Sequence, residues 1–519
     1  MLALAIHFDA LRRAPRAYLL ALWWRLQGKR LRSRAHFAPL LGASSRAYEL
    51  WLRDEIRSKG DTYDDNGRPS IIALVAGGDD PDALDATLRS AASEGFSTIT
   101  ITTASALAVA AKQIDWEANP WIMPLTAGDI LAAGAGRAYR AATRQTDAKI
   151  IYADDDLIGA GKQRTKVHLK PNWNSELFRY FDYLTGACII RAEAHDLNGA
   201  CEPQWASQLV YGALRFEGAP HHVQRVLHHR RSRPLPCVPA KPLATETPPI
   251  TVIVPTRNRL DLLRTCLDGV SRTNYRDLEV LVVDNDSDDP ATLAYLQSLD
   301  PIRYRVLRHP GAFNFSAINN HAVREARGHL ICLLNNDIEV IEPDWLMTMV
   351  SQAQREDVGA VGARLLYPDG RIQHAGVVLG VGGGAAHAHR LLEPQEEGYF
   401  HRHGLPQFVS AVTAACLVVT RERFLQVGGL DEQRFAVAFN DVDLCMRLNR
   451  RGWQSLYEPR ATLIHHESVS RGFDRDSVGA ARLAKELAAL KHLWGTGYQI
   501  DPFHHPELSA FSEQFVLKL

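Results

Sequence analysis

The sequence predicts an α/β protein made of two tandem modules that follow a helical N-terminal segment. Short apolar runs that fit buried strands alternate with helical patterns, as in sheets whose strands are joined by helices. The alternation begins near residue 69, stops at a proline-rich stretch, residues 236–249, and begins again at Ile250. We therefore expect one module over residues 69–235 and a second over residues 250–480.

Residues 1–68 carry Leu, Trp and Arg at mixed helical spacing, which predicts helices. Within them, Ala17 to Arg34 places a Trp pair and several Leu beside basic residues. Such a segment either lies on a membrane surface or is a basic helix packed on its own protein, and we favour the second interpretation. No apolar run has the length of a membrane-spanning helix, and the N-terminus lacks the features of a signal peptide.

Each module opens with a buried strand followed by a helix. In the first, the strand IIALVAG precedes a helix over Pro81–Ala92 and a strand over Ser97–Thr102. In the second, the strand ITVIVPT starts the series. The elements predicted after it are a helix over Asp261–Thr273, the strand LEVLVVD, a strand over Tyr304–Leu307, a helix over Ser316–Ala326 and a strand over Leu330–Leu334. Residues 481–519 are predicted as a C-terminal helical tail.

The two modules are related by an internal repeat. Four blocks of the first copy match four blocks of the second in the same order, beginning with IALVAGGDDPDALDATLRSA against VIVPTRNRLDLLRTCLDGVS and ending with VLHHRRS against LIHHESVS. Where the second copy has Asn335-Asn336-Asp337, the first has Thr126-Ala127-Gly128. We therefore expect the first module to be degenerate and the second to carry the chemistry.

Composition excludes several classes of partner and site. Lys plus Arg and Asp plus Glu both number 59, so the net charge is zero and no nucleic-acid partner is expected. The 7 cysteines are scattered without a CxxC pair, which fits buried thiols in a reducing compartment better than disulfides or a zinc module. These features predict a cytoplasmic protein.

Polar side chains follow three predicted strands of the second module. Thr256 and Asn258 follow the first, Asp284 ends the second, and Asp337 follows the buried run that starts at Leu330. The carboxyl ends of parallel strands form the edge at which open α/β sheets bind ligands. Asp337 there is suited to a divalent cation, because hard cations take oxygen ligands; the alternative is a polar turn without a metal.

Two further sites have a functional and a structural interpretation. Asp441 lies at the start of a predicted helix, where a carboxylate either acts as a general base or stabilises the helix end. His465 is either a metal ligand beside Asp337 or a structural histidine. His387, His389, His401 and His403 crowd a glycine-rich region, but their spacing matches no standard zinc site.

With these residues in hand, the second half resembles glycosyltransferase family 2, inverting enzymes of GT-A fold. The resemblance covers about Pro249 to Gly472 and rests on a combination of motifs: IVPTRNR, VVDNDS, FNFSAINNHAVREARG, LLNNDIEV, SAVTAACLVV, GGLDE, FNDVDLCMRL and HHESVSRG. The later motifs and the tandem arrangement look like bacterial O-antigen and rhamnosyltransferase-type proteins. The fold implied is two tandem GT-A-like modules, the first degenerate.

The resemblance implies roles for ten residues. Asp441 would be the catalytic base, and Asp337 would hold Mg2+ or Mn2+ on a diphosphate, with His465 as a further metal ligand. The nucleotide would be bound by Pro255, Thr256, Asn258, Asp284, Asn319, Asn335 and Asn336. One departure is that Asn335 stands where the DxD motif of the family begins with an acid.

The same resemblance implies the substrates. The donor would be a nucleotide-diphosphate sugar, dTDP-rhamnose or another UDP- or GDP-sugar. The acceptor would be a glycan or lipid-linked glycan of a growing surface polysaccharide, which leaves open a location at the inner face of the plasma membrane.

Two alternatives come from other classes. One is a non-catalytic carbohydrate-binding or scaffold protein. Such a protein would not need acids at Asp337 and Asp441, so their presence argues against this class for the second module. An NAD-dependent oxidoreductase is suggested only by the glycines of Gly380–Gly384, which lie late in the module and do not follow its first strand.

Overall fold

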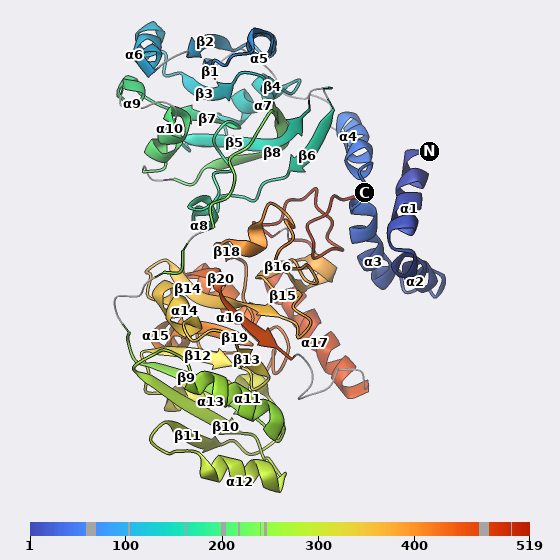
Figure 1. Cartoon of the computed structure of the whole chain (residues 1–519), viewed down its shortest axis with the longest axis vertical. Coiled ribbons are helices and arrows are strands. Elements are labelled where there is room, and N and C mark those ends of the chain that lie inside the picture. The colour runs from blue at the N-terminus through green and yellow to red at the C-terminus, as the bar shows by residue number, and fades with distance from the viewer. Residues whose placement is uncertain are drawn as a thin grey trace.

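The computed structural model of the 519-residue chain shows two α/β modules and a helical arm beside them (Figure 1). It describes residues 1–58, 69–101, 104–159, 161, 163–198, 204–215, 218–238, 240–242, 247–466, 477–499 and 501–519. The helical arm consists of α1 (Leu2–Arg13), α2 (Pro15–Leu26), α3 (Arg30–Gly42) and α4 (Ala47–Ser58). The predicted helical N-terminal segment is therefore present.

The first module is one mixed sheet with helices on both faces. Its strands are β1 (Ile71–Ala76), β2 (Ser97–Ile101), β3 (Trp121–Thr126), β4 (Ile130–Leu131), β5 (Ile150–Ile158), β6 (Arg164–His168), β7 (Cys188–Arg191) and β8 (His221–Arg230). Its helices are α5 (Pro81–Ser93), α6 (Ala104–Gln113), α7 (Ala135–Ala142), α8 (Ser175–Phe178), α9 (Ala194–Asn198) and α10 (Trp205–Ala213).

The second module repeats this design with more elements. Its strands are β9 (Ile250–Thr256), β10 (Leu278–Asp284), β11 (Tyr304–Arg308), β12 (Leu330–Leu334), β13 (Ile338–Val340), β14 (Val358–Leu366), β15 (Ile372–His374), β16 (Val377–Leu379), β17 (Ala385–His387), β18 (Gln407–Val409), β19 (Cys416–Thr420) and β20 (Gln454–His465). Its helices are α11 (Leu260–Ser271), α12 (Pro290–Ser298), α13 (Phe315–Glu325), α14 (Trp345–Ala353), α15 (Arg421–Gln426), α16 (Asn440–Arg450) and α17 (Ser477–Trp494), with short 3-10 turns at Val381–Gly383 and Arg402–Gly404.

The strand order confirms the duplication. The first sheet runs β2-β1-β3-β7-β5-β8-β4, and the second runs β10-β9-β12-β19-β14-β20-β13 with β11 added at one edge. Every pair of corresponding strands is also parallel or antiparallel alike, from β1 with β2 to β4 with β8. The predicted arrangement of two tandem α/β modules is confirmed.

Burial on both faces explains the apolar strands. All five residues of β12 are buried, and they pack alternately into the two cores on either side of the sheet. A fully apolar run is the pattern expected of such a strand. Its polar continuation after Leu334 therefore lies at the edge of the sheet.

The predicted helical tail over residues 481–519 is wrong beyond its first part. The helix α17 ends at Trp494, and Gly495 follows in a left-handed conformation with φ of 65°, which favours glycine. The rest is an irregular segment between the two modules (Figure 1). Its Phe515 joins Trp51 of α4, Val226 of β8 and Val378 of β16 in one small apolar cluster. The tail thus connects the arm and both modules.

Among the described residues, no helix is both long enough and apolar enough to cross a membrane. Six cysteines are described and all are free, five of them buried and Cys237 exposed, while Cys201 lies outside the described residues.

The α17 helix supports the loop that leads into α16. The buried Glu486 carboxylate accepts hydrogen bonds from the backbone N–H of Val437 at 3.1 Å and of Ala438 at 2.8 Å. Removing a charged acceptor leaves two buried donors without a partner. We expect Glu486→Ala to lower the free energy of unfolding by about 2 kcal/mol, measured by urea denaturation. Lys485→Ala on the exposed face of the same helix is the control, and an equal loss there would contradict the assignment.

Candidate active site

The second module has a cavity of about 590 Å³ at the carboxyl ends of β9 and β12. Eight of the ten residues selected from the sequence line it: Pro255, Thr256, Asn258, Asn335, Asn336, Asp337, Asp441 and His465. Two do not, Asp284 and Asn319. The strand-end argument therefore brings most of the expected side chains to one place.

Strand pairing brings Asp337 and His465 together. Ile338, the first residue of β13, pairs with His465 at the end of β20. The side chains of Asp337 and His465 are both nearly buried, and His465 Nε2 lies 3.1 Å from Asp337 Oδ1. The other ring nitrogen, Nδ1, lies 2.7 Å from the Gln373 amide oxygen and donates to it.

This proton assignment makes the pair suitable for a cation. A neutral imidazole carries one proton, so a proton on Nδ1 leaves a lone pair on Nε2, which faces a carboxylate oxygen. Two acceptors at 3.1 Å repel each other unless a cation or proton lies between them. Orientation of a ligating histidine by an amide acceptor is common around bound metals. The residues present therefore fit a divalent cation.

Backbone and side-chain hydrogen bonds hold the opposite wall of the cavity. Asn336 donates to the Thr256 hydroxyl at 3.1 Å. The Asn258 side chain donates to Asp288 Oδ1 at 2.7 Å and accepts from the N–H groups of Asp288 and Asp289, each at 3.0 Å. Asn258 thus joins the loop after β9 to the loop after β10.

Asp441 projects from the first turn of α16 and is half-buried. Burial raises the pKa of its carboxyl, against hydrogen bonds from the backbone N–H of Ala414 at 3.1 Å and of Val442 at 2.8 Å. A fixed carboxylate with a raised pKa is a stronger base than an ordinary aspartate. This suits it to take a proton from a hydroxyl group.

The two remaining residues, Asp284 and Asn319, do not line the cavity. Asp284 is 2% exposed, accepts from the N–H of Ser287 at 3.0 Å and lies 3.6 Å from Arg308. Its neighbour Asn285 lines the cavity instead. Asn319 is fully buried in α13 and donates to the Phe315 carbonyl at 2.8 Å.

The sequence named His387 only as one of four crowded histidines, whereas the structure places it on the cavity wall beside the buried His374. The N–H of Thr413 lies 3.4 Å from His374 Nε2, which accepts, so His374 carries its proton on Nδ1. That proton is donated to Nδ1 of His387 at 2.7 Å. Burial keeps both rings neutral, lowering the pKa of His387 to about 4. His387 lines the cavity, and its Nε2–H is left as a donor.

Three more residues that line the cavity were less clearly indicated by the sequence. Arg257 and Arg259 flank the predicted Asn258 and both line the cavity, and the Arg259 guanidinium donates to Asp261. Gln373 orients His465, as described above, and lies in β15 within a hairpin insertion. The arginines could have been selected by their position after β9, whereas nothing in the local pattern points to Gln373.

The first module retains one acid at this position. The sequence alignment set Gly128 opposite Asp337, and that assignment is wrong. Asp129 directly precedes β4, as Asp337 directly precedes β13, and each short strand pairs with the histidine-bearing end of the last long strand. Asp129 is therefore the counterpart, but its Oδ1 accepts from the backbone N–H of Arg231 at 2.9 Å.

Charged side chains of the first module fill the space that corresponds to the cavity. A Cβ atom at Gly186 would lie 2.5 Å from Arg230 Nη2, and Gly186 aligns with the cavity-lining Ala414. Arg230 lies 3.7 Å from Asp155, which also pairs with the buried Lys170 at 2.8 Å. Arg230 thus lies beside Gly186, where the second module has its cavity-lining Ala414.

The glycines that suggested a dinucleotide site serve another purpose. They follow the edge strand β16, and no α-helix starts there. A Cβ atom at Gly384 would lie 2.5 Å from Leu487 of α17, and one at Gly380 would lie 3.2 Å from the Gln499 carbonyl. The chain after β16 thus packs closely against α17 and the tail, and Gly380 also has a φ of 82°, which favours glycine.

Comparison with known proteins identifies part of the chain. Residues 251–380 match the sequence model of the family described as Glycosyl transferase family 2. An uncharacterised protein, y4gI of Sinorhizobium fredii, is 39% identical over 420 residues, which are 72% of this chain and 46% of that protein. The O-antigen biosynthesis protein RfbC of Myxococcus xanthus is 35% identical over 410 residues, 70% of this chain and 32% of that protein. The chain thus spans less than half the length of these two relatives.

Two further similarities are shorter or weaker. An N-acetylglucosaminyl-diphospho-decaprenol L-rhamnosyltransferase of Mycobacterium tuberculosis is 45% identical over 73 residues, 14% of this chain and 24% of that protein. Among solved structures, the mannosyltransferase PcManGT of Pyrobaculum calidifontis, in complex with GDP-Man and Mn2+, is 19% identical with a TM-score of 0.37, covering 50% of this chain and 68% of that one.

The raised pKa of Asp441 makes a prediction about stability. A carboxyl that holds its proton more tightly when folded contributes stability at low pH, and this contribution is lost as pH rises through the folded-state pKa. Asp441→Asn removes the buried charge, so we expect its melting temperature at pH 7.5 to exceed the parent's by a few degrees. The difference should vanish near pH 4.

Asp431 is the matched control because its pKa moves in the opposite direction. Burial alone would raise the pKa of Asp431, but hydrogen bonds from the N–H groups of Arg434 and Gln433 and from the Arg434 side chain hold it below its ordinary value. Asp431→Asn should therefore lower the melting temperature at pH 7.5. A lower melting temperature for Asp441→Asn as well would count against the assigned burial effect.

Proposed function

Because residues 251–380 form a glycosyl transferase family 2 domain, we propose that this protein transfers a hexose from a nucleotide-diphosphate donor to a growing bacterial surface polysaccharide, with inversion. The main support for this proposal is that Asp337, His465 and Asp441 line one cavity. Mg2+ or Mn2+ held by Asp337 and His465 would stabilise the charge that develops on the departing diphosphate.

The chain's own residues provide the remaining steps. Asp441 takes the proton of the acceptor hydroxyl, whose oxygen forms the new bond at the anomeric carbon as the bond to the diphosphate oxygen breaks. Arg257 and Arg259 line the cavity and would supply positive charge for the nucleoside diphosphate, Arg259 from an ion pair with Asp261. Thr256, Asn258, Asn335 and Asn336 supply polar contacts to the nucleotide.

The donor proposal is a deoxyhexose nucleotide such as dTDP-rhamnose, with UDP- and GDP-sugars as alternatives. It is supported by the rhamnosyltransferase and O-antigen names of two relatives. Asp284 and Asn319 do not line the cavity, and in this proposal they position residues that do. Asp284 anchors the loop that presents Asn285 to the cavity, and Asn319 belongs to α13, whose Ile318 lines it.

The test is a calorimetric binding screen followed by turnover. Purified protein is titrated with dTDP-rhamnose, UDP-sugars, GDP-sugars and NADH, each with Mn2+, Mg2+ or chelator. We expect metal-dependent binding of one nucleotide sugar, lost in Asp337→Ala. Asp441→Asn should keep that affinity while kcat falls by about 100-fold to 10,000-fold, the usual contribution of a general base. Retained turnover would remove Asp441 from the base role.

Other outcomes separate the alternatives. Binding of a glycan but of no nucleotide sugar would favour a non-catalytic carbohydrate-binding or scaffold protein. Binding of NADH alone would favour an oxidoreductase, although the surroundings of Gly380–Gly384 do not support it.

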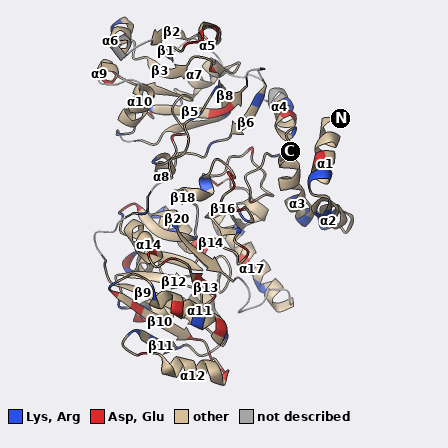
Figure 2. Ribbon diagram, in the orientation of Figure 1, with Lys and Arg blue, Asp and Glu red and all other residues tan. Residues whose placement is uncertain are grey.

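We also propose that the helical arm contacts an anionic membrane surface at the inner face of the plasma membrane, which fits a lipid-linked acceptor. The sequence favoured packing of these helices on the protein, but a row of their apolar side chains is exposed: Leu4, Phe8, Leu19, Leu20, Leu22, Trp23, Leu26 and Leu31. Residues 1–48 also contain nine Lys or Arg and one acid, Asp9 (Figure 2). Exposed apolar side chains beside basic ones suit an interfacial helix.

Vesicle sedimentation tests this contact. Trp23→Glu with Leu26→Glu should reduce binding to vesicles that contain anionic lipid by at least about tenfold, because each change removes buried apolar area and adds repulsion. Ile302→Glu, at an equally exposed apolar residue of the second module, is the control. Unchanged binding of the double variant would contradict a membrane contact through α2.

A further inference from the structure

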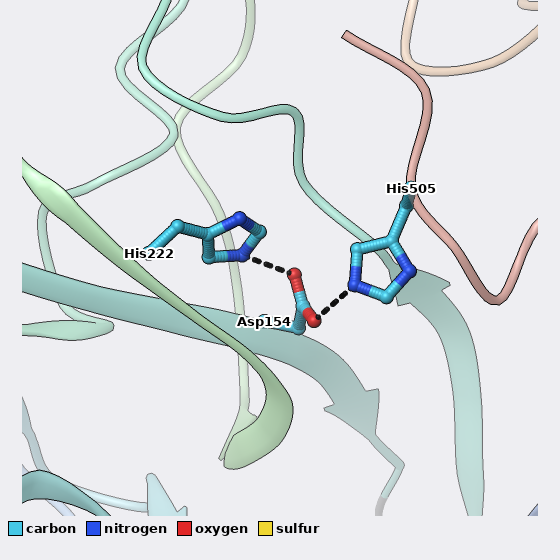
Figure 3. Close-up of side chains that lie close together, drawn as sticks. All are labelled: Asp154, His222 and His505. Carbon is cyan, nitrogen blue, oxygen red and sulfur yellow. Dashed lines mark hydrogen bonds and ion pairs between the residues drawn. The ribbon is translucent and has the colours of Figure 1, made fainter. Parts of the chain in front are cut away.

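A second cluster of ligand-type side chains lies outside the candidate active site. Asp154 of β5, His222 of β8 and His505 of the C-terminal tail meet in the first module (Figure 3). Asp154 Oδ1 is 2.9 Å from His222 Nε2, and Asp154 Oδ2 is 3.0 Å from His505 Nε2. The three side chains are at most 3% exposed.

Asp154 differs from the two aspartates that follow it. Asp155 forms ion pairs with Lys170 and Arg233, and Asp156 forms one with Arg164. Among the described residues, the ion pairs of Asp154 come from histidines alone. A buried carboxylate requires a positive charge nearby, and here either a protonated histidine or a bound cation would supply it.

His222 presents both ring nitrogens to oxygen atoms. Its Nε2 lies 2.9 Å from the buried Asp154 Oδ1, and its Nδ1 lies 3.3 Å from the Asn172 side-chain oxygen, which also accepts from Gln224 at 3.2 Å. A cation bound at Nε2 would replace the proton there, and Nδ1–H would then donate to Asn172, as is common for ligating histidines.

The tail contributes the third ligand-type side chain. His505 Nε2 and Asp154 Oδ2 are 3.0 Å apart. This separation fits a histidine–carboxylate pair and also two ligands of one common ion. All three ligand atoms lie within 4.8 Å of one another.

From this geometry we infer that Asp154, His222 and His505 form a structural zinc site, distinct from the proposed Mg2+ or Mn2+ site at Asp337. Two imidazole nitrogens and one carboxylate oxygen suit Zn2+ better than the harder cations, and a water would complete four ligands. His505 Nδ1 accepts from the N–H of Glu507 at 3.1 Å. Zinc binding at Nε2 moves the ring proton to Nδ1 and breaks this one contact.

The inferred site would fasten the tail where it supports the active-site wall. Four residues before His505, the buried Asp501 accepts from the N–H of Leu379 at 2.8 Å. Leu379 ends β16, which pairs with β17, the strand that carries His387 into the cavity. A bound ion in the first module would therefore hold a tail segment that positions part of the second.

Metal analysis of the full-length protein is the direct test. After exposure to equimolar Zn2+ and Mn2+ and gel filtration, we expect one zinc per chain in the parent and in Asp337→Ala. We expect none in Asp154→Asn and in His505→Ala. His504→Ala is the matched control, because this adjacent buried histidine lies outside the cluster. Co2+ in place of zinc should give visible absorption in the parent and not in Asp154→Asn.

A second readout does not depend on the variants folding. Zinc should raise the melting temperature of the parent by several degrees and slow tryptic removal of the tail. Absence of zinc from the parent, with neither effect, would overturn the inference and leave a histidine–carboxylate ion pair held by a proton. Zinc content is independent of nucleotide sugars, so this result is separate from the outcome of the donor screen.

Discussion

The pairing of β13 with the end of β20 is the constraint on which the cavity depends. It brings Asp337 and His465 together although they are far apart in the sequence. Asp337 directly precedes β13 and His465 ends β20, so neither residue can leave the cavity edge without unpairing a strand. The same pairing recurs between β4 and β8 of the first module. The duplicated fold therefore presents an acid and a histidine at the same edge twice.

The sequence predicted the parts of the site that follow from local pattern. An apolar run ending in Asn335-Asn336-Asp337 predicts both a buried strand and the polar edge beyond it, because parallel strands end at a common edge. Gln373 and His387 could not be found this way, since they lie in a hairpin insertion whose partners come from distant strands. Strand ends can be misplaced by one residue in such a prediction: the sequence selected Asp284, whereas its neighbour Asn285 lines the cavity.

Long-range packing explains the other differences. A helical period predicts a helix, but it does not predict where a tail turns back, and here Gly495 ends α17 so that residues 501–519 can pack between the modules. The choice of Gly128 as the counterpart of Asp337 also failed for this reason. Sequence similarity can slip by one position in a loop, whereas the register of the following strand cannot slip without exposing a buried face.

Buried carboxylates show a physical difference between the two modules. Each needs a cation, and the chain provides for this in different ways. Asp155 has Lys170 and Arg233, so its charge is balanced from within and the space beside it is filled. Asp337 lies 3.1 Å from His465 and lines an open cavity, which leaves room for an external ion and a charged substrate.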